Sequence, residues 1–167
     1  MDERSPLTAP PVPSASPAPK SDFAVRHPAR ILVVDDNPIN RRVALRLLEN
    51  LGYQPTFAVD GESALGHLRE NPCDLVLMDD QMPGLSGPEC TAEIRRQLPV
   101  ERQPVIVALT ANALEGDRER YLGAGMDEYL TKPLHLDHLT GLLARLLELR
   151  DRLHARLGGD LRGRQAK

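Results

Sequence analysis

Short apolar runs alternate with amphipathic stretches along most of this chain. The apolar runs suit strands that are buried on both faces, and the stretches between them carry apolar residues at helical spacing. The predicted strands are 30–34, 53–58, 74–78, 104–109 and 126–130, and the predicted helices are 38–51, 61–70, 88–97, 113–122 and a long segment from about 135. Five strand-helix units in this order predict an α/β fold with a doubly wound, five-stranded parallel sheet.

Turn and cap residues support these boundaries. Gly52 follows the first helix, Asn71-Pro72 marks a turn, and Pro38 stands at a helix start, where its missing N–H group is not needed. Because crossovers between parallel strands are right-handed, the carboxyl ends of all strands meet at one edge of the sheet. Ligands bind at that edge in sheets of this kind.

Two of the apolar runs end in aspartate. Residues 31–34 are followed by Asp35 and Asp36, and residues 75–78 by Asp79. If the two strands are adjacent, three carboxylates converge, and two charges about 4 Å apart repel by about 4 kcal/mol at an effective dielectric near 20. Such a cluster requires protons or a cation, and Mg²⁺ prefers carboxylate oxygens and leaves room for phosphate. The cluster therefore predicts a phosphoryl-transfer site.

A hydroxyl and an ammonium group follow two later strands. Thr110 comes after the run 104–109, and Lys132 comes shortly after the run 126–130. Together they would bind the oxygens of a phosphorylated aspartate, the hydroxyl as donor and the ammonium as counter-charge. Each residue alone is an ordinary strand-end or surface residue. The order of acid pair, acid, hydroxyl and lysine, each after its own strand, favours one shared site.

Four segments make the chain resemble the receiver domain of two-component response regulators: ILVVDDNPIN, DLVLMDDQMPGLSG, VIVALTANA and GMDEYLTKPL. The resemblance covers about residues 29–149, and Asn-Pro-Ile-Asn is most like receivers attached to hybrid histidine kinases. It implies a flavodoxin-like sheet with strand order 2-1-3-4-5 and a function in phosphorelay signal transduction. The expected phosphodonor is a phosphohistidine on a histidine kinase or histidine phosphotransfer domain. Such a domain is not a conventional enzyme, although it catalyses its own phosphorylation and dephosphorylation.

The resemblance assigns the acidic residues. Asp79 is the expected phosphoacceptor, and Asp35, Asp36 and Asp79 are the expected Mg²⁺ ligands. The backbone carbonyl of Gln81 would be a further ligand. One departure from the family is Asp80, where an uncharged residue is usual, and this extra carboxylate either alters the local charge or points to solvent.

The resemblance also assigns the switch. Lys132 would pair with the phosphoryl group, and the Lys132-Pro133 peptide bond is typically cis in the family. Thr110 would move toward the phosphoryl group and let Tyr129 rotate into the vacated space. Gln81 and Asn112 would flank the hydrolytic water and tune the lifetime of the phosphoryl group.

The composition argues against nucleic-acid binding and against membrane insertion. The 167 residues carry a formal net charge of −3, with 3% aromatic residues, so neither electrostatics nor base stacking favours nucleic-acid binding. No apolar run approaches the roughly 18 residues of a membrane span, and no secretory signal is visible, so we expect no membrane insertion. Cys73 and Cys90 have no metal-binding spacing and indicate free thiols in a reducing cytoplasm.

Two alternatives belong to other functional classes. A Mg²⁺-dependent phosphatase or phosphotransferase with an aspartyl nucleophile typically has a second acid two residues after the nucleophile and a cap domain. Here that position is Gln81, and no segment is long enough for a cap. A phosphorylation-independent binding module is the other alternative, but all five site positions keep their functional residue types.

The two ends of the chain differ in composition from the central domain. Residues 1–28 are rich in Pro, Ala and Ser and predict a disordered linker, whereas 29–149 form the receiver domain. Residues 150–167 predict a helical extension that ends at Gly158-Gly159, followed by a basic tail. Leucines continue along this extension, so it needs a surface to cover it, either a second copy in a homodimer or another protein. On the first helix, Ile39 is the candidate contact for the phosphodonor.

Overall fold

Five parallel strands form one sheet at the centre of the molecule, in the order β2-β1-β3-β4-β5. The strands are β1 Ile31–Val34, β2 Thr56–Ala58, β3 Leu75–Asp79, β4 Val105–Thr110 and β5 Glu128–Thr131. This computed structural model describes the backbone of residues 21–163 and the side chains of residues 21–156. The predicted flavodoxin-like fold and strand order are confirmed.

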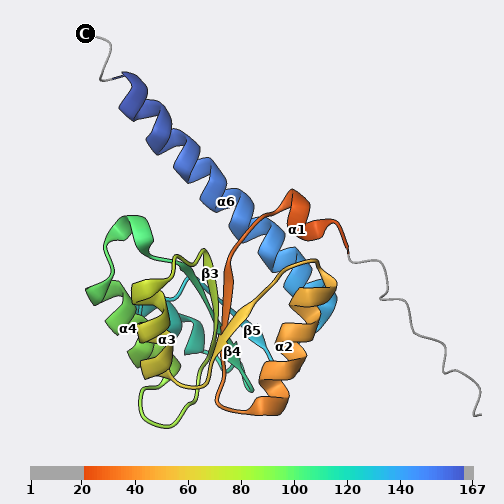
Figure 1. Ribbon diagram of the computed structural model, residues 1–167. Coiled ribbons are helices and arrows are strands. Elements are labelled where there is room, and N and C mark those ends of the chain that lie inside the picture. The colour runs from red at the N-terminus through yellow and green to blue at the C-terminus, as the bar shows by residue number, and fades with distance from the viewer. Residues whose placement is uncertain (1–20, 164–167) are drawn as a thin grey trace, which may run out of the picture.

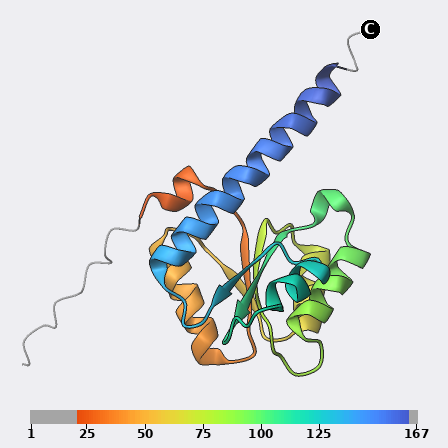
Figure 2. The ribbon, with the colours of Figure 1, turned by 180° about the vertical axis from the view of Figure 1, so that it is seen from behind.

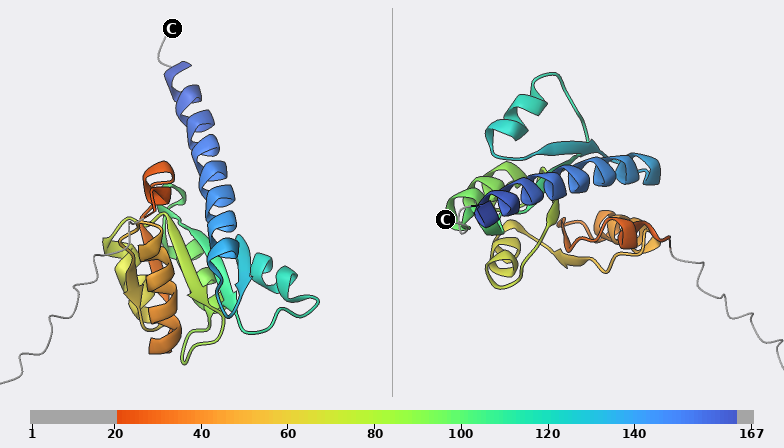
Figure 3. Two further views of the ribbon diagram at one scale, coloured as in Figure 1. Left: turned by 90° about the vertical axis from the view of Figure 1, so that its right-hand side faces the viewer. Right: turned by 90° about the horizontal axis from the view of Figure 1, so that it is seen from above.

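Helices cover both faces of the sheet (Figures 1 and 2). They are α1 Phe23–Arg26, α2 Pro38–Asn50, α3 Gly61–Glu70, α4 Gly87–Gln97, α5 Asp117–Gly123 and α6 Leu136–Gly163, with a short 3₁₀ turn at Val100–Arg102. Successive side chains of a strand point to opposite faces, so Leu32 packs with the cluster under α3, α4 and α5. Its neighbour Val33 packs with the cluster under α2 and α6. Figure 3 shows the sheet between these two layers.

The fourth predicted helix, 113–122, is shorter than expected. α5 begins at Asp117, because Gly116 adopts a φ of +93°, outside the helical region. The Asp117 carboxylate accepts a hydrogen bond from the N–H of Leu114 at 2.9 Å and fixes the preceding loop. This loop follows β4 directly and borders the carboxyl edge of the sheet. Strand β2 is also shorter than the predicted 53–58.

Part of the N-terminal segment that was predicted to be a disordered linker is folded against the domain. Residues 21–28 are ordered against the domain: Phe23 in α1 is 5% exposed and belongs to the core under α2 and α6. The N–H of Ala24 donates to the carbonyl of Leu51 at 3.0 Å, and the Tyr53 hydroxyl donates to the carbonyl of His27 at 2.6 Å. The composition had suggested that this segment could not offset the entropy cost of becoming ordered. The buried Phe23 ring and these hydrogen bonds do offset that cost for residues 21–28. Residues 1–20 of the predicted linker lie outside the described residues.

The C-terminal helix is longer than predicted. α6 continues through Gly158-Gly159 to Gly163, so the predicted helix end is wrong. Glycine in a helix interior costs about 1 kcal/mol relative to alanine but does not force a stop. The helix projects well beyond the sheet (Figure 1). Leu149 and Leu153 of α6 are 52% and 51% exposed. Among the described helices, none combines the length and apolar character that a membrane crossing requires.

Removing the aromatic anchor of α1 should destabilise the domain. We expect Phe23→Ala to lower the free energy of unfolding by about 3 kcal/mol, because Phe-to-Ala changes in a core remove both transfer energy and packing. Urea denaturation measures the difference. Val25→Ala is the matched control, since Val25 lies on the same helix and is 82% exposed. Equal effects of the two substitutions would show that α1 does not contribute to the core.

Candidate functional site

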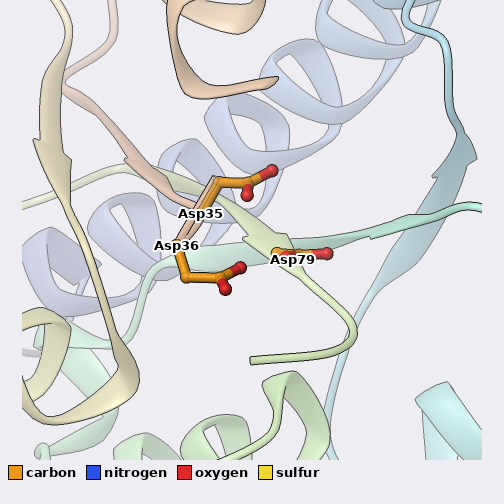
Figure 4. A group of neighbouring side chains, drawn as sticks. All are labelled: Asp35, Asp36 and Asp79. Carbon is orange, nitrogen blue, oxygen red and sulfur yellow. The ribbon is translucent and has the colours of Figure 1, made fainter. Parts of the chain in front are cut away.

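The sheet brings the three predicted carboxylates together. Val34 of β1 pairs with Met78 of β3, so the next residues, Asp35 and Asp79, lie side by side at the carboxyl edge of the sheet. One carboxylate oxygen from each of Asp35, Asp36 and Asp79 lies within 4.8 Å of the other two. Figure 4 shows the three side chains at the ends of their strands. The predicted convergence is therefore present in the structure.

Lys132 lies among these carboxylates. Thr110 of β4 pairs with Thr131 of β5, which brings the following residue, Lys132, to the same edge. Its Nζ donates to Asp79 Oδ1 at 2.9 Å and to Asp35 Oδ2 at 3.0 Å. The Lys132-Pro133 peptide bond is cis, as the family resemblance implied. One ammonium group thus bridges two of the three acids.

Burial and charge perturb the ionisation of this cluster. Burial raises the pKa of Asp79 to about 6, and the negative charge of Asp35 adds to the rise, while Lys132 opposes it. Although burial lowers the pKa of Lys132, its hydrogen bonds to Asp79 and Asp35 raise it overall above the ordinary value. By formal charge, three carboxylates and one ammonium group give the site a net charge of −2. This oxygen-rich donor set fits a hard divalent cation.

The loops around the cluster are fixed locally. Asn37 caps α2 by accepting a hydrogen bond from the N–H of Ile39 at 2.9 Å. The N–H of Asn37 itself donates to Asp35 Oδ1 at 2.9 Å, so the helix cap also orients the acid. On the other side, α4 begins so close to β3 that a Cβ atom at Gly87 would collide with the carbonyl oxygen of Asp79. Glycine at this position lets the acceptor loop close over the strand end.

A cavity of about 530 Å³ opens beside Asp79. It is lined by other predicted site residues, namely Asp36, Gln81, Thr110, Asn112 and Lys132. The Thr110 hydroxyl donates to the carbonyl of Asn112 at 3.0 Å and accepts from its N–H at 3.2 Å. Tyr129 lies on β5 outside this lining, half-buried, with its ring centroid 6.0 Å from that of Tyr121.

The sequence did not reveal the surroundings of Asp80. Its side chain is buried, with 6% of the residue exposed, so the interpretation that it points to solvent is wrong. The Asp80 carboxylate accepts hydrogen bonds from Arg120 Nη2 at 2.9 Å and from the Tyr121 hydroxyl at 2.9 Å. Both partners come from α5, forty and forty-one residues later in the chain, and no sequence pattern connects them to Asp80.

Several known proteins are similar to this chain in sequence or in fold. The histidine kinase BarA of Shigella flexneri is 40% identical over 115 residues, which are 69% of this chain and 12% of BarA. The chain thus spans about an eighth of that relative's length. The receiver domain of the sensor histidine kinase PA1611 from Pseudomonas aeruginosa, solved with magnesium in its active-site cleft, is 43% identical with a TM-score of 0.65. That match covers 72% of this chain and 98% of the PA1611 domain.

A third match is the Saccharomyces cerevisiae complex of the histidine phosphotransfer protein Ypd1 with the receiver domain of Ssk1. The similarity is 31% identity and a TM-score of 0.62, over 68% of this chain and 85% of the matched chain. The family model for the response regulator receiver domain matches residues 31–144, which include every strand and the whole acidic cluster. The chain therefore belongs to the response regulator receiver domain family.

Proposed function

We propose that this domain accepts a phosphoryl group from a phosphohistidine onto Asp79 and thereby changes a protein-binding surface. The observation that carries the proposal is the position of Asp79: its carboxylate borders an open cavity and is hydrogen-bonded to Lys132 beside two further acids. Family membership supports a signalling role in two-component phosphorelay. The matched relative BarA is a histidine kinase, which supports a histidine-based donor.

In this proposal Asp35, Asp36 and Asp79, with the backbone carbonyl of Gln81, hold one Mg²⁺ ion. The magnesium-bound PA1611 receiver domain and the two uncompensated charges of the acidic cluster support this assignment. When bound, Mg²⁺ would neutralise negative charge on the phosphoryl oxygens and orient the group for transfer.

The chain's own residues carry the transfer. An oxygen of Asp79 attacks phosphorus, the new O–P bond forms as the N–P bond of the donor breaks, and the imidazole keeps the electron pair. Lys132 already donates to Asp79 Oδ1 and would donate to a phosphoryl oxygen as charge develops there. The product is an acyl phosphate on Asp79.

The response to this phosphoryl group would pass through Thr110. Its hydroxyl is held by Asn112 in the structure and must exchange those two hydrogen bonds for a phosphoryl oxygen. Movement of Thr110 would free space for Tyr129, which is half-buried on the neighbouring strand. Gln81 and Asn112 line the cavity around Asp79, which supports their proposed effect on the lifetime of the phosphoryl group.

The proposed phosphodonor surface includes the start of α2. Ile39 is 72% exposed and stands two residues after Asn37, which lines the cavity. The Ypd1–Ssk1 complex supports a histidine phosphotransfer protein as one class of donor. Self-association through Leu149 and Leu153 stays a prediction. The two free thiols, Cys73 and Cys90, support a location in the reducing cytoplasm.

The two alternative functions have less support. In an aspartyl phosphatase, the residue two places after the nucleophile is an acid, whereas here it is Gln81. Within the described residues, every helix and strand belongs to the one sheet domain or extends α6, and none forms a cap over the cavity. A phosphorylation-independent module would have no need of the ion pairs that hold Asp79 and Lys132 in place.

Incubation with acetyl phosphate and Mg²⁺ tests the proposal directly. We expect the intact chain to gain one alkali-labile phosphoryl group, detected by mass spectrometry, because Asp79 needs no protein donor to react. Asp79→Asn should remove the modification, since a carboxamide cannot form the acyl phosphate. Glu115→Gln, on the exposed loop before α5, is the matched control and should label normally. Labelling that persists in Asp79→Asn would refute the assignment.

Neutralising Asp79 should stabilise the metal-free fold. The folded pKa of about 6 lies above the ordinary aspartate value of 3.8, so the stability associated with protonated Asp79 is present below the unfolded pKa and lost as pH rises through 6. At pH 7.5 in EDTA, Asp79→Asn should therefore raise the free energy of unfolding by about 1–3 kcal/mol. Near pH 4 the gain should vanish.

Adding Mg²⁺ should narrow that difference in stability. At a hundred-fold excess over its dissociation constant, Mg²⁺ should stabilise the wild-type chain by about 2.7 kcal/mol and the Asp79→Asn variant by less. Urea denaturation with and without Mg²⁺ measures both differences. An equal response of the two proteins would argue against Asp79 as a ligand.

Changing the exposed end of α2 should separate donor docking from chemistry. We expect Ile39→Asp to slow phosphotransfer from a phosphorylated histidine phosphotransfer protein about ten-fold or more, because a charge replaces an exposed apolar contact. Labelling by acetyl phosphate should remain unchanged, since Ile39 does not line the cavity. Equal losses in both assays would indicate damage to the fold and not to docking.

A further inference from the structure

Asp80 and Arg120 form an ion pair directly beside the phosphoacceptor. Arg120 Nη2 lies 3.2 Å from Asp80 Oδ1 and 2.9 Å from Oδ2, and the Tyr121 hydroxyl donates to the same Oδ2 at 2.9 Å. The Asp80 side chain is 8% exposed, whereas the Arg120 side chain is 53% exposed. The carboxylate is thus fixed inside the protein, while the arginine side chain is half exposed.

Arg120 also lines the cavity that contains Asp79. The same cavity is bordered by Thr110 and Lys132, so two cationic side chains reach it from different elements. Lys132 pairs with Asp79 and Asp35. Arg120 is engaged by Asp80 at the cavity wall and lies 3.8 Å from the Asp117 carboxylate. Arg120 therefore brings a second positive charge to the cavity, and this charge is paired with Asp80 and not with the phosphoacceptor Asp79.

Phosphorylation would change the competition for Arg120. A phosphoryl group brings a charge of about −1.5 to −2 and three acceptor oxygens to a position next to Asp80 in the chain. The planar guanidinium group binds phosphate with two parallel hydrogen bonds, which a lysine cannot do. If Arg120 moves, Asp80 keeps the hydrogen bond from the buried Tyr121 hydroxyl and is not left without a partner.

We propose that Arg120 is a second phosphoryl-binding residue, which Asp80 holds in reserve until Asp79 is phosphorylated. The inference rests on the proposed function of Asp79. Asp80 then acts as a positioning residue, because it competes with the phosphoryl group for the guanidinium. Transfer of Arg120 from Asp80 to the phosphoryl group would also pull on α5, where Arg120 and Tyr121 are neighbours.

Tyr121 links this exchange to the predicted switch. It is 1% exposed and packs against Tyr129, and the Arg120 guanidinium lies 5.0 Å from its ring centroid. Burial raises the pKa of Tyr121, whereas the Thr110 hydroxyl beside it lowers the pKa. The Tyr121 hydroxyl donates to Asp80 and accepts a hydrogen bond from Arg120 Nη2 at 3.3 Å, so separation of the ion pair reaches this buried ring.

Beryllofluoride, an analogue of the phosphoryl group, provides the test. Its dissociation constant is measured with Mg²⁺ by calorimetry on the full chain. Arg120→Gln should weaken binding about five-fold, whereas Asp80→Asn should tighten it about three-fold because the guanidinium is released. The double variant should behave like Arg120→Gln alone. Arg118→Gln, the same charge change on an exposed residue of α5, should bind like wild type.

The opposite effects of Arg120→Gln and Asp80→Asn on beryllofluoride binding distinguish a phosphoryl-binding role of Arg120 from a purely structural role. If Asp80 and Arg120 only maintain the fold, both substitutions weaken binding together, and the proposal is overturned. Arg120→Lys, which keeps the charge without the planar fork, should bind between wild type and Arg120→Gln. If wild type and Arg120→Gln bind equally while Asp79→Asn does not bind, the reserve role fails and the function of Asp79 stands. If wild type itself does not bind, both proposals fail.

Discussion

The repulsion among three carboxylates at one edge of the sheet is the interaction on which the rest of the site depends. Parallel pairing of β1 and β3 forces Asp35 and Asp79 together, and the acid pair adds Asp36. Lys132 offsets only part of this charge, and burial raises the pKa of Asp79 to about 6. The fold thus maintains an electrostatic strain that a divalent cation or a change at Asp79 relieves. A site built in this way responds strongly to charge.

Two ion pairs balance the negative charge near Asp79. Lys132 contacts the acceptor directly, whereas Arg120 is paired with Asp80 at the wall of the same cavity. The pair of Lys132 and Asp79 stabilises the unmodified site. The pair of Arg120 and Asp80 can rearrange, because the Arg120 side chain is half exposed. Both cations come from elements after β4, the strand that ends in Thr110. Events at the acceptor are therefore coupled to the α5 and β5 side of the domain.

The opposite edge of the sheet joins the two flanks. Arg150 of α6 lies 3.3 Å from Asp74 and also donates to the carbonyl of Pro28, while Arg30 contacts the same Asp74 carboxylate at 3.0 Å. α1 docks nearby through Phe23, and α6 leaves the domain from this edge (Figures 1 and 3). The chain segments that enter and leave the domain are consequently fixed to each other, far from the acidic cluster. This arrangement separates the chemical site from the connections of the domain.

The sequence by itself determined the strands, their order by resemblance, and the convergence of Asp35, Asp79 and Lys132, because strand ends in a parallel sheet share one edge. Three predictions from the sequence were wrong because local sequence pattern did not decide the structure. α5 begins later than predicted, after Gly116, and α6 continues through two glycines. Part of the proline-rich N-terminal flank is ordered, because Phe23 is buried in the core. Only the tertiary structure placed Arg120 and Tyr121 on Asp80. That contact joins residues forty positions apart through packing of α5 on the sheet, and no local periodicity encodes it.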